Sequence, residues 1–301
     1  MIILRINGAG TKTRALAYRK DGTLIGAGYS GSSNYHNVGV DKAGVNIMDA
    51  TSKTGAGKAD IACVALAGID ANRHFDEVRP AVLGIAKRVI IEQDSYAELY
   101  AETRGSNGVI AVAGTGSSVI GIDGKHRIRA SGCGWLLSDN GSGYAIGREG
   151  LRTACRLLNA GKRRTALVNS VMKKIGAKEL DDLVVWAYDK SYDISSIAQI
   201  AVAVEDAAKK GDNDAKRMIN NCARELGSYA NDIASRVGVK VVYCTGGMFK
   251  SALYVKEFSR TLKTRGARME VTKNNPAVGA ACIAADRLGK LGGKFKPKVV
   301  A

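Results

Sequence analysis

Residues 109–118 read VIAVAGTGSS, a run of strand-forming residues that leads straight into a glycine-rich turn. Two further turns of this kind, NGAGTKT at residues 7–13 and TGGM at residues 245–248, also follow strand-forming runs. Glycine lets the backbone take φ > 0 and leaves room for other atoms, and successive exposed N–H groups in such turns bind anions. Three such turns, with Asp94 closing a strand between the first and the second, indicate one nucleotide held in a cleft.

The order of the strand-forming runs indicates two related α/β domains. The first and second glycine turns each follow one strand. Each is then followed by a second strand, an Asp-Gly turn and a third strand. The strands are expected at residues 2–7, 12–18 and 24–29, around Asp21-Gly22, and at residues 108–113, 117–122 and 126–130, around Asp123-Gly124. This repeats an architecture rather than a sequence. At 301 residues the chain also exceeds the size at which a single core usually stops growing.

Helical and strand patterns alternate through the rest of the chain. In the first domain we expect a helix at 39–54, a strand at 60–66, a helix at 76–86, a strand at 87–91 and a helix at 95–104. After Ser131 comes a long helical stretch, in which Ile197, Ile200 and Val204 recur at helical spacing and are typical of core residues. The alternation resumes with a strand at 240–244, a helix at 250–264, a strand at 268–272 and a helix from Pro276.

These patterns predict the domain bounds. The N-terminal domain covers residues 1–106, and the C-terminal domain covers residues 107–290 with a helical insertion at about 143–212. The helix at 276–290 is expected to pack back onto the N-terminal domain. Residues 291–301, which contain paired glycines and alternating lysines, are expected to form a flexible basic tail.

Charge and composition limit the classes of partner. The net charge of +17 is consistent with nucleic-acid binding, because a basic surface gains affinity for nucleic acid by releasing counterions from the phosphates. The basic residues are dispersed, however, and the chain has no RNA-recognition motif, basic zipper or zinc finger, so a solvated basic face is favoured. No apolar run approaches the roughly 20 residues that span a bilayer, and the first residues lack a signal-peptide pattern. We expect a cytoplasmic protein that binds neither membranes nor nucleic acid.

Five segments together carry a resemblance to one family. They are NGAGTKT at 7–13, SNYHN at 33–37, IEQD at 91–94, GWLLSDNGS at 134–142 and PAVGA at 276–280. Over essentially its whole length the chain resembles the N-acetylglucosamine kinase or BadF/BadG/BcrA/BcrD ATPase family, and especially its archaeal ATP-dependent hexokinases. The resemblance implies the fold of the sugar kinase, Hsp70 and actin superfamily: two related ribonuclease H-like, actin-like ATPase domains with a central cleft. It also implies a homodimer.

The resemblance assigns the glycine turns to ATP. Phosphoryl transfer depends mostly on positioning and charge stabilisation, and the first two turns would supply backbone donors and hydroxyl groups to the β- and γ-phosphates. The third turn would let adenosine lie against the backbone. The implied ATP-binding residues are Gly8, Gly10, Thr11, Lys12, Gly114, Thr115, Gly116, Ser117, Gly246 and Gly247. For Lys12, an exposed strand lysine is an equally good interpretation.

The resemblance places the catalytic base at Asp94. A sugar hydroxyl holds its proton tightly at neutral pH, so a carboxylate must accept that proton as the new bond forms. Asp94 could instead cap the helix that opens at Ser95. The implied sugar-binding residues are Asn34, Asp70, Asp94, Gly132, Gly134 and Asp139, of which Asp139 could equally form a turn. His36 and His74 have no acidic partner in sequence and receive no catalytic role.

Asn7 departs from the pattern of the superfamily. The first phosphate turn usually begins with an aspartate that holds Mg²⁺, often through water. An amide keeps the hydrogen-bonding shape but removes a negative charge, and Mg²⁺ prefers carboxylate and phosphate oxygens. We therefore expect Mg²⁺ to rest largely on ATP, with Asn7 contacting it through water. Phosphate transfer is then expected to be slow or to need more Mg²⁺.

The sequence thus favours a kinase that uses ATP and Mg²⁺ to phosphorylate a small-molecule sugar. It would transfer the γ-phosphate to the 6-hydroxyl of a hexose or N-acetylhexosamine such as glucose, N-acetylglucosamine or mannose. A sugar- or nucleotide-binding sensor, weakened catalytically by Asn7, is the alternative. A third interpretation is an ATPase that activates a CoA-ester dehydratase through an iron–sulfur cluster. It is weak because Cys133 has no second thiol close by in sequence.

Overall fold

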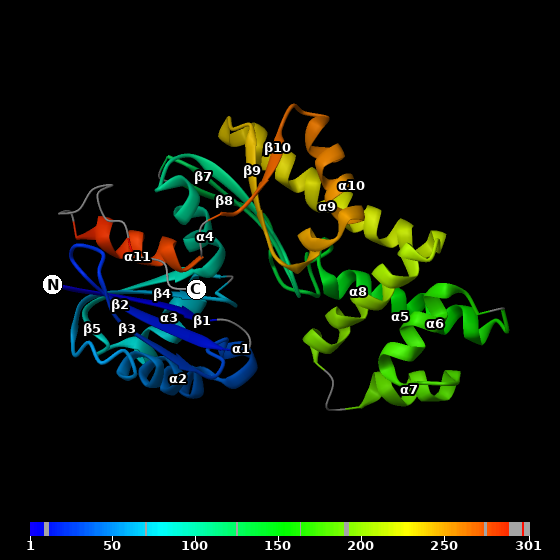
Figure 1. Ribbon diagram of the computed structural model, residues 1–301, viewed down its shortest axis with the longest axis horizontal. Helices are drawn as coiled ribbons and strands as arrows, with labels where there is room; N and C mark the ends of the chain where they lie inside the picture. Colours follow the sequence, from blue (N-terminus) through cyan, green and yellow to red (C-terminus); the bar gives the residue numbers. More distant parts are fainter. Residues whose placement is uncertain are drawn as a thin grey trace. The chain divides into compact units, whose positions relative to one another are not determined.

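The computed structural model describes residues 1–8, 12–69, 71–124, 126–162, 164–189, 193–273, 276–288 and 297. The chain divides into two compact units: Met1–Ser106 with Thr272–Ala301, here the first unit, and Asn107–Val271, the second unit. Each unit is built on a sheet of five strands (Figure 1). Among the described residues, no helix combines the length and the apolar character needed to cross a bilayer.

The sheet of the first unit has the strand order β3-β2-β1-β4-β5. Its strands are β1 (Ile2–Gly8), β2 (Thr13–Arg19), β3 (Leu24–Ser30), β4 (Ala59–Leu66) and β5 (Ala86–Gln93). The first three pair antiparallel, whereas β1, β4 and β5 run parallel. Side chains alternate along a strand, so Leu4 and Ile6 enter one core and Ile3 enters another on the opposite face.

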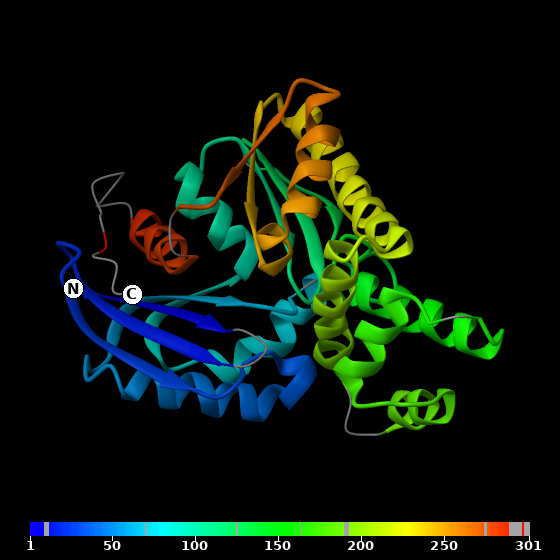
Figure 2. The ribbon, with the colours of Figure 1, turned by 45° about the vertical axis from the view of Figure 1, so that its right-hand side comes forward.

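Helices cover both faces of this sheet. They are α1 (Tyr35–Val38), α2 (Val40–Ser52), α3 (Asn72–Val82), α4 (Asp94–Thr103) and α11 (Pro276–Arg287). The core around Leu4 includes Ile47 of α2, and the core around Ile3 includes Ala97 of α4 and several residues of α11. Figure 2 shows α2 and the red helix α11 on opposite sides of the blue strands. A Cβ on Gly279 of α11 would lie 1.6 Å from the Ala97 carbonyl oxygen, so only glycine allows these helices to pack this closely.

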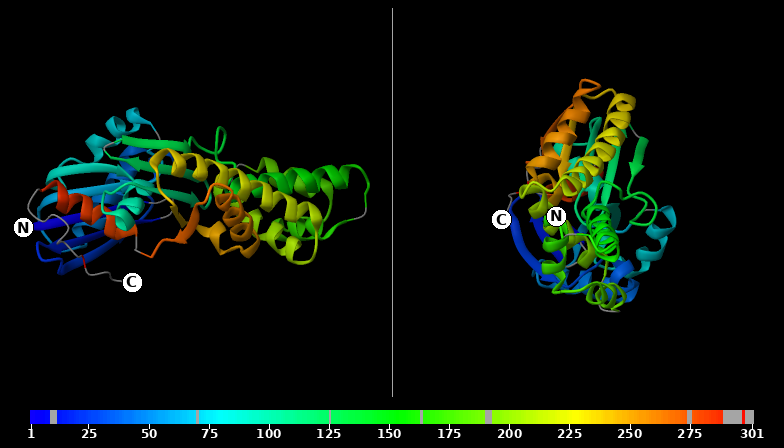
Figure 3. Two further views of the ribbon diagram at one scale, coloured as in Figure 1. Left: turned by 90° about the horizontal axis from the view of Figure 1, so that it is seen from above. Right: turned by 90° about the vertical axis from the view of Figure 1, so that its right-hand side faces the viewer.

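The sheet of the second unit has the strand order β10-β9-β6-β7-β8. The strands are β6 (Gly108–Ala113), β7 (Ser117–Asp123), β8 (His126–Ser131), β9 (Val241–Thr245) and β10 (Arg268–Val271). The helices are α5 (Gly143–Asn159), α6 (Ala166–Ile175), α7 (Leu180–Tyr188), α8 (Ile194–Lys209), α9 (Asn213–Val237), α10 (Ala252–Lys263) and the 3₁₀ turn η1 (Gly247–Lys250). Figure 3 shows the long helix α9 beside the strands, with α5 to α8 gathered at one end of them.

The expected strands of both sheets are confirmed, with bounds that differ by one or two residues. One helix was placed wrongly: it was expected at 76–86 and lies at Asn72–Val82. It ends early because Gly84 has φ of +97° and β5 begins at Ala86. Asp94 follows the strand rather than ending it, since β5 closes at Gln93 and Asp94 is the first residue of α4. Of the expected tail 291–301, only Pro297 lies within the described residues.

Candidate active site

The carboxyl ends of three parallel strands bring candidate residues together in the first unit. β1 ends at Gly8, β4 ends at Leu66, and β5 ends at Gln93 immediately before Asp94. In open α/β sheets, ligands bind outside this edge. A Cβ at position 8 would lie 2.1 Å from Ser33 Oγ and 2.5 Å from Leu66 Cδ2, so a larger residue there would displace both side chains.

Asn34 lies beside the segment that follows β4. Its Oδ1 accepts a hydrogen bond from the His36 backbone N–H at 3.1 Å, which caps α1. A Cβ on Gly68 would lie 3.0 Å from Asn34 Oδ1, and His36 Nε2 lies 2.9 Å from the Gly68 carbonyl oxygen. The rings of His36 and His74 have centroids 5.1 Å apart. The structure thus gathers an amide and an imidazole at Gly68, with a second imidazole against the first. Asp70, two residues after Gly68 in sequence, lies outside the described residues.

Asp94 is half-buried at the N-terminus of α4, where the helix dipole favours a negative charge. Its Oδ1 accepts a hydrogen bond from the Ser95 N–H at 2.7 Å. This is the helix-terminal contact expected as the alternative to catalysis, and a carboxylate has enough acceptor sites to make it and still accept a proton. The contact therefore positions the carboxylate without excluding a catalytic role.

Glu98 lies one helical turn after Asp94, on the same side of α4. Its Oε2 is buried and has no hydrogen-bond partner in the described part of the chain. Burial is the main cause that raises the pKa of Glu98 to about 8, and the negative charge of Asp94 adds to it. Glu98 belongs to none of the motifs recognised in the sequence, although its spacing of four residues from Asp94 was visible there.

Asn7 shares a strand face with two arginines. Asn7 lies on β1 directly opposite Arg14 of β2, and Arg5 lies two residues earlier with 1% of its surface exposed. Burial lowers the pKa of Arg5 to about 10. Within the described ranges, no group of three or more His, Cys, Asp or Glu side chains is placed to hold a metal ion. The Asn7 side chain is an amide and supplies no carboxylate, whereas Mg²⁺ prefers carboxylate and phosphate oxygens.

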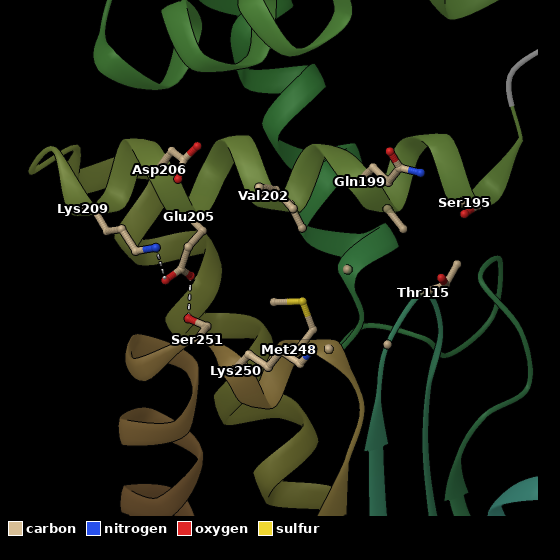
Figure 4. A pocket seen from close by; sticks show the side chains of 15 residues that line it. Thr115, Ser195, Gln199, Val202, Glu205, Asp206, Lys209, Met248, Lys250 and Ser251 are labelled. Atoms are coloured by element: carbon tan, nitrogen blue, oxygen red, sulfur yellow. Dashed lines mark hydrogen bonds and ion pairs between the residues drawn. The ribbon is translucent and has the colours of Figure 1, made fainter. Parts of the chain in front are cut away.

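A pocket of about 600 Å³ lies in the second unit and joins two of the glycine turns (Figure 4). The second turn contributes Gly114 and Thr115, and the third contributes Gly247 and Met248. Helix α8 forms the facing wall, which includes Gln199, Val202, Glu205, Asp206 and Lys209. The pocket thus has a backbone floor, a wall with apolar and charged side chains, and a volume suited to a small-molecule ligand.

Backbone geometry holds the glycine turns in place around this pocket. Gly246 has φ of +108°, and a Cβ on it would lie 2.3 Å from the Ala113 carbonyl oxygen, so the third turn can approach β6 only with glycine. The Gly143 N–H donates to the Gly114 carbonyl at 2.8 Å, and the Tyr144 N–H donates to the Thr115 carbonyl at 3.1 Å. The first turn of α5 is therefore bonded to the second glycine turn.

Glu205 organises the charged end of the pocket. Its Oε2 accepts a hydrogen bond from Ser251 Oγ at 2.5 Å, and its Oε1 lies 3.7 Å from Lys209 Nζ. Figure 4 shows both contacts beside Met248. The apolar face of α8 was expected to belong to the core, whereas its pocket face was not predicted from the sequence. The adjacent acidic residues Glu205 and Asp206, in a helix otherwise rich in Ala, Val and Ile, were the available signal.

The loop before α5 brings Asp139 to the second glycine turn. Asp139 is 8% exposed, and a Cβ on Gly116 would lie 2.5 Å from Asp139 Oδ2. Its carbonyl accepts a hydrogen bond from Ser142 Oγ at 2.5 Å, and Ser142 caps α5. Asp139 therefore forms a turn, as one interpretation predicted, and also places its carboxylate against a glycine turn.

The other predicted residues fall into three groups. Gly132 and Gly134 have φ of +94° and +90° and belong to the loop that leads to Asp139. Lys12 and Thr115 are exposed, whereas Ser117 is 4% exposed at the start of β7. The remaining two, Gly10 and Thr11, lie outside the described residues.

Comparisons with known proteins identify the family of this chain. The model of the BadF/BadG/BcrA/BcrD ATPase family matches residues 6–284, and the chain belongs to that family. N-acetyl-D-glucosamine kinase of Dictyostelium discoideum is 27% identical, with 94% of this chain and 97% of that protein covered. N-acetylmuramic acid/N-acetylglucosamine kinase of Clostridium acetobutylicum is 26% identical with the same coverage.

Solved structures confirm the expected fold. A structure from Chromobacterium violaceum that carries the name N-acetylglucosamine kinase superposes with a TM-score of 0.80 at 20% identity, covering 94% of this chain and 98% of that one. A ROK family glucokinase from Streptomyces griseus, in complex with glucose and AMPPNP, gives a TM-score of 0.57 at 14% identity, with coverage of 94% and 98%. The expectation of an α/β protein with the two-domain, actin-like fold of sugar kinases is confirmed.

Proposed function

We propose that this protein is an ATP-dependent sugar kinase that transfers the γ-phosphate to the 6-hydroxyl of a hexose or N-acetylhexosamine. The observation that carries the proposal is the pocket of the second unit, in which two glycine turns far apart in the chain meet opposite α8. Family membership and the sugar kinases among the relatives support the same reaction class.

The pocket is the proposed site of the nucleotide. The backbone at Gly247 leaves space for a flat base, since nothing lies within 4 Å of a Cβ built there. Gly114 likewise has an open Cβ position, so its turn can approach phosphate oxygens closely. The ion-paired Glu205 and Lys209 offer polar groups at the far side of the pocket, where ribose hydroxyl groups could be bound.

Asp94 is the proposed base for the sugar hydroxyl. It lies at the carboxyl edge of the parallel strands, oriented by the Ser95 N–H. A carboxylate held there accepts the hydroxyl proton as the phosphorus–oxygen bond forms, and ADP leaves with the negative charge. Asn34 is a proposed sugar ligand from the same edge, and Asp70, two residues after Gly68 in sequence, is another. From the second unit, Asp139 is the proposed ligand, in a loop that also contains Gly132 and Gly134.

The choice of sugar follows the relatives. Both kinases named above act on N-acetylglucosamine by name, so an N-acetylhexosamine is the first substrate to examine and unmodified hexoses are the second. Mg²⁺ is expected to accompany ATP, but no step is assigned to a metal held at Asn7. The weakened sensor remains the alternative, because Asn7 stands where the superfamily usually has the aspartate that holds Mg²⁺.

A coupled assay of ADP release, with ATP, MgCl₂ and a panel of N-acetylglucosamine, glucosamine, mannose and glucose, tests the proposal. We expect sugar-dependent release, lost in Asp94→Ala and kept in the matched control Asp76→Ala, whose exposed side chain lies on α3. Sugar-independent release would indicate an ATPase. No release, together with measurable sugar binding, would instead indicate the sensor.

A further inference from the structure

The loop that contains Asp139 is held by two helices that come much later in the chain. On α10, the Tyr254 side chain is fully buried, and its hydroxyl donates a hydrogen bond to the Gly141 carbonyl at 2.6 Å. On α9, Leu226 lies so close that a Cβ on Gly141 would be 2.6 Å from the Leu226 Cβ. The loop therefore lies directly on α9, and α10 fixes one of its backbone carbonyls.

Glu225 of α9 makes a side-chain contact with the same loop. Its Oε1 accepts a hydrogen bond from Asn140 Nδ2 at 2.7 Å and a second one from the Tyr229 hydroxyl at 3.0 Å. Hydrogen bonds to a carboxylate are shorter and stronger than those between neutral groups. Burial and the bond to Glu225 raise the pKa of Tyr229, so this hydroxyl keeps its proton and remains a donor. One carboxylate oxygen thus joins the loop to α9.

Asn140 directly follows Asp139, so its position limits where the Asp139 side chain can lie. The Asp139 carbonyl accepts hydrogen bonds from the Ser142 backbone N–H at 3.1 Å and from the Ser142 hydroxyl at 2.5 Å. Asp139 Oδ2 lies against the second glycine turn, 2.5 Å from the place that a Cβ on Gly116 would take. The turn to Ser142, the contact with Gly116 and the bond from Asn140 to α9 therefore determine together where the Asp139 carboxylate lies.

The contact between Asn140 and Glu225 has a direction, because the loop donates and the helix accepts. An amide can donate or accept, whereas an ionised carboxylate only accepts, so Glu225 holds the amide in one orientation. We propose that Glu225 is a positioning residue for sugar binding, which sets the place of the Asp139 carboxylate by holding Asn140. The inference rests on the proposed kinase function, in which Asp139 binds the sugar. A misplacement of about 1 Å can cost about 10²-fold in activity, so loss of the contact should be measurable in the KM for sugar.

Sugar-dependent ADP release, with the KM for sugar and the KM for ATP measured separately, tests the inference. Asn140→Asp sets two carboxylates against each other and should raise the KM for sugar about tenfold, with the KM for ATP unchanged. Adding Glu225→Gln to that variant restores a donor and an acceptor in the reverse direction. The double variant should therefore return the KM for sugar to within about threefold of wild type. Glu225→Gln alone keeps an oxygen that can accept both hydrogen bonds and should resemble wild type.

Asp232→Asn is the matched control. It removes a negative charge from the same helix, at a side chain that is 58% exposed and ion-paired with Arg265, and should leave both KM values unchanged. Thermal unfolding of each ligand-free variant confirms that it is folded when its KM is measured.

An unchanged KM for sugar in Asn140→Asp, or no recovery in the double variant, would overturn the inference. Equal rises in the KM for sugar and the KM for ATP would also overturn it, because they would indicate a general loss of structure rather than a displaced Asp139. Each of these outcomes is observed in an active protein and leaves the kinase function intact. A wild-type protein without sugar-dependent ADP release would instead contradict the kinase function, and the role of Glu225 in sugar binding with it.

Discussion

Replacing Glu98 by glutamine should remove a pH-dependent cost to stability in the first unit. The rise in the pKa of Glu98 from 4.5 to about 8 means that the folded protein holds this proton more tightly than the unfolded chain does. At about 1.36 kcal/mol per pKa unit, the cost is absent below pH 4.5, grows as the pH rises, and reaches roughly 5 kcal/mol above pH 8. Glutamine keeps the shape of the protonated side chain and has no proton to lose.

Urea unfolding followed by far-UV circular dichroism at pH 5.5 and pH 8.5 measures this cost. We expect the stability advantage of Glu98→Gln over wild type to be about 1.4 kcal/mol at pH 5.5 and to grow by about 3 kcal/mol between pH 5.5 and pH 8.5. The control Asp76→Asn changes a carboxylate whose side chain is 80% exposed and should track wild type at both pH values. Unfolding slopes should remain equal, because the surface exposed on unfolding does not change.

Parallel stability curves for wild type and Glu98→Gln would refute this reasoning. They would mean that Glu98 is ionised in the folded protein at neutral pH, so that its buried Oε2 must have a partner such as water or a cation. A variant that is less stable at pH 8.5 would go further and show that the ionised carboxylate stabilises the fold.

Three further changes probe the site and the core. Asp94→Asn should lower kcat by about 10²–10⁴-fold, because an amide cannot accept the hydroxyl proton. Nucleotide affinity measured by calorimetry should stay the same. A variant with wild-type kcat would show that Asp94 is not the base. Gly279→Ala should destabilise the protein by about 2 kcal/mol or more, since the added Cβ would lie 1.6 Å from a backbone oxygen of α4. An unchanged thermal midpoint would contradict the close packing of α11 against α4. Glu205→Gln should raise the KM for ATP several-fold, because Lys209 loses its ion pair in the proposed nucleotide pocket. The KM for sugar should be unchanged. A change in the KM for sugar alone would mean that the nucleotide binds elsewhere.

The strand pattern and the glycine turns were readable from the sequence because both are local. Alternating apolar residues specify which face of a strand is buried, and Gly246 with its positive φ is the residue type that such a turn demands. The resemblance carried by five short segments then led to the correct family and fold. The local pattern predicted the ends of helices less reliably. The helix at Asn72–Val82 was expected at 76–86, and it ends earlier because of the turn at Gly84.

The tertiary structure alone revealed the features that depend on residues distant in sequence. The pocket face of α8 became visible only when that helix was seen opposite the turns at Gly114 and Gly247. The positive charge of Arg5 looked like that of any strand arginine until the sheet register placed it under two helices, among neutral groups and a second arginine. Burial and charge compensation are set by neighbours that the fold brings together, and periodicity within one segment carries no information about them.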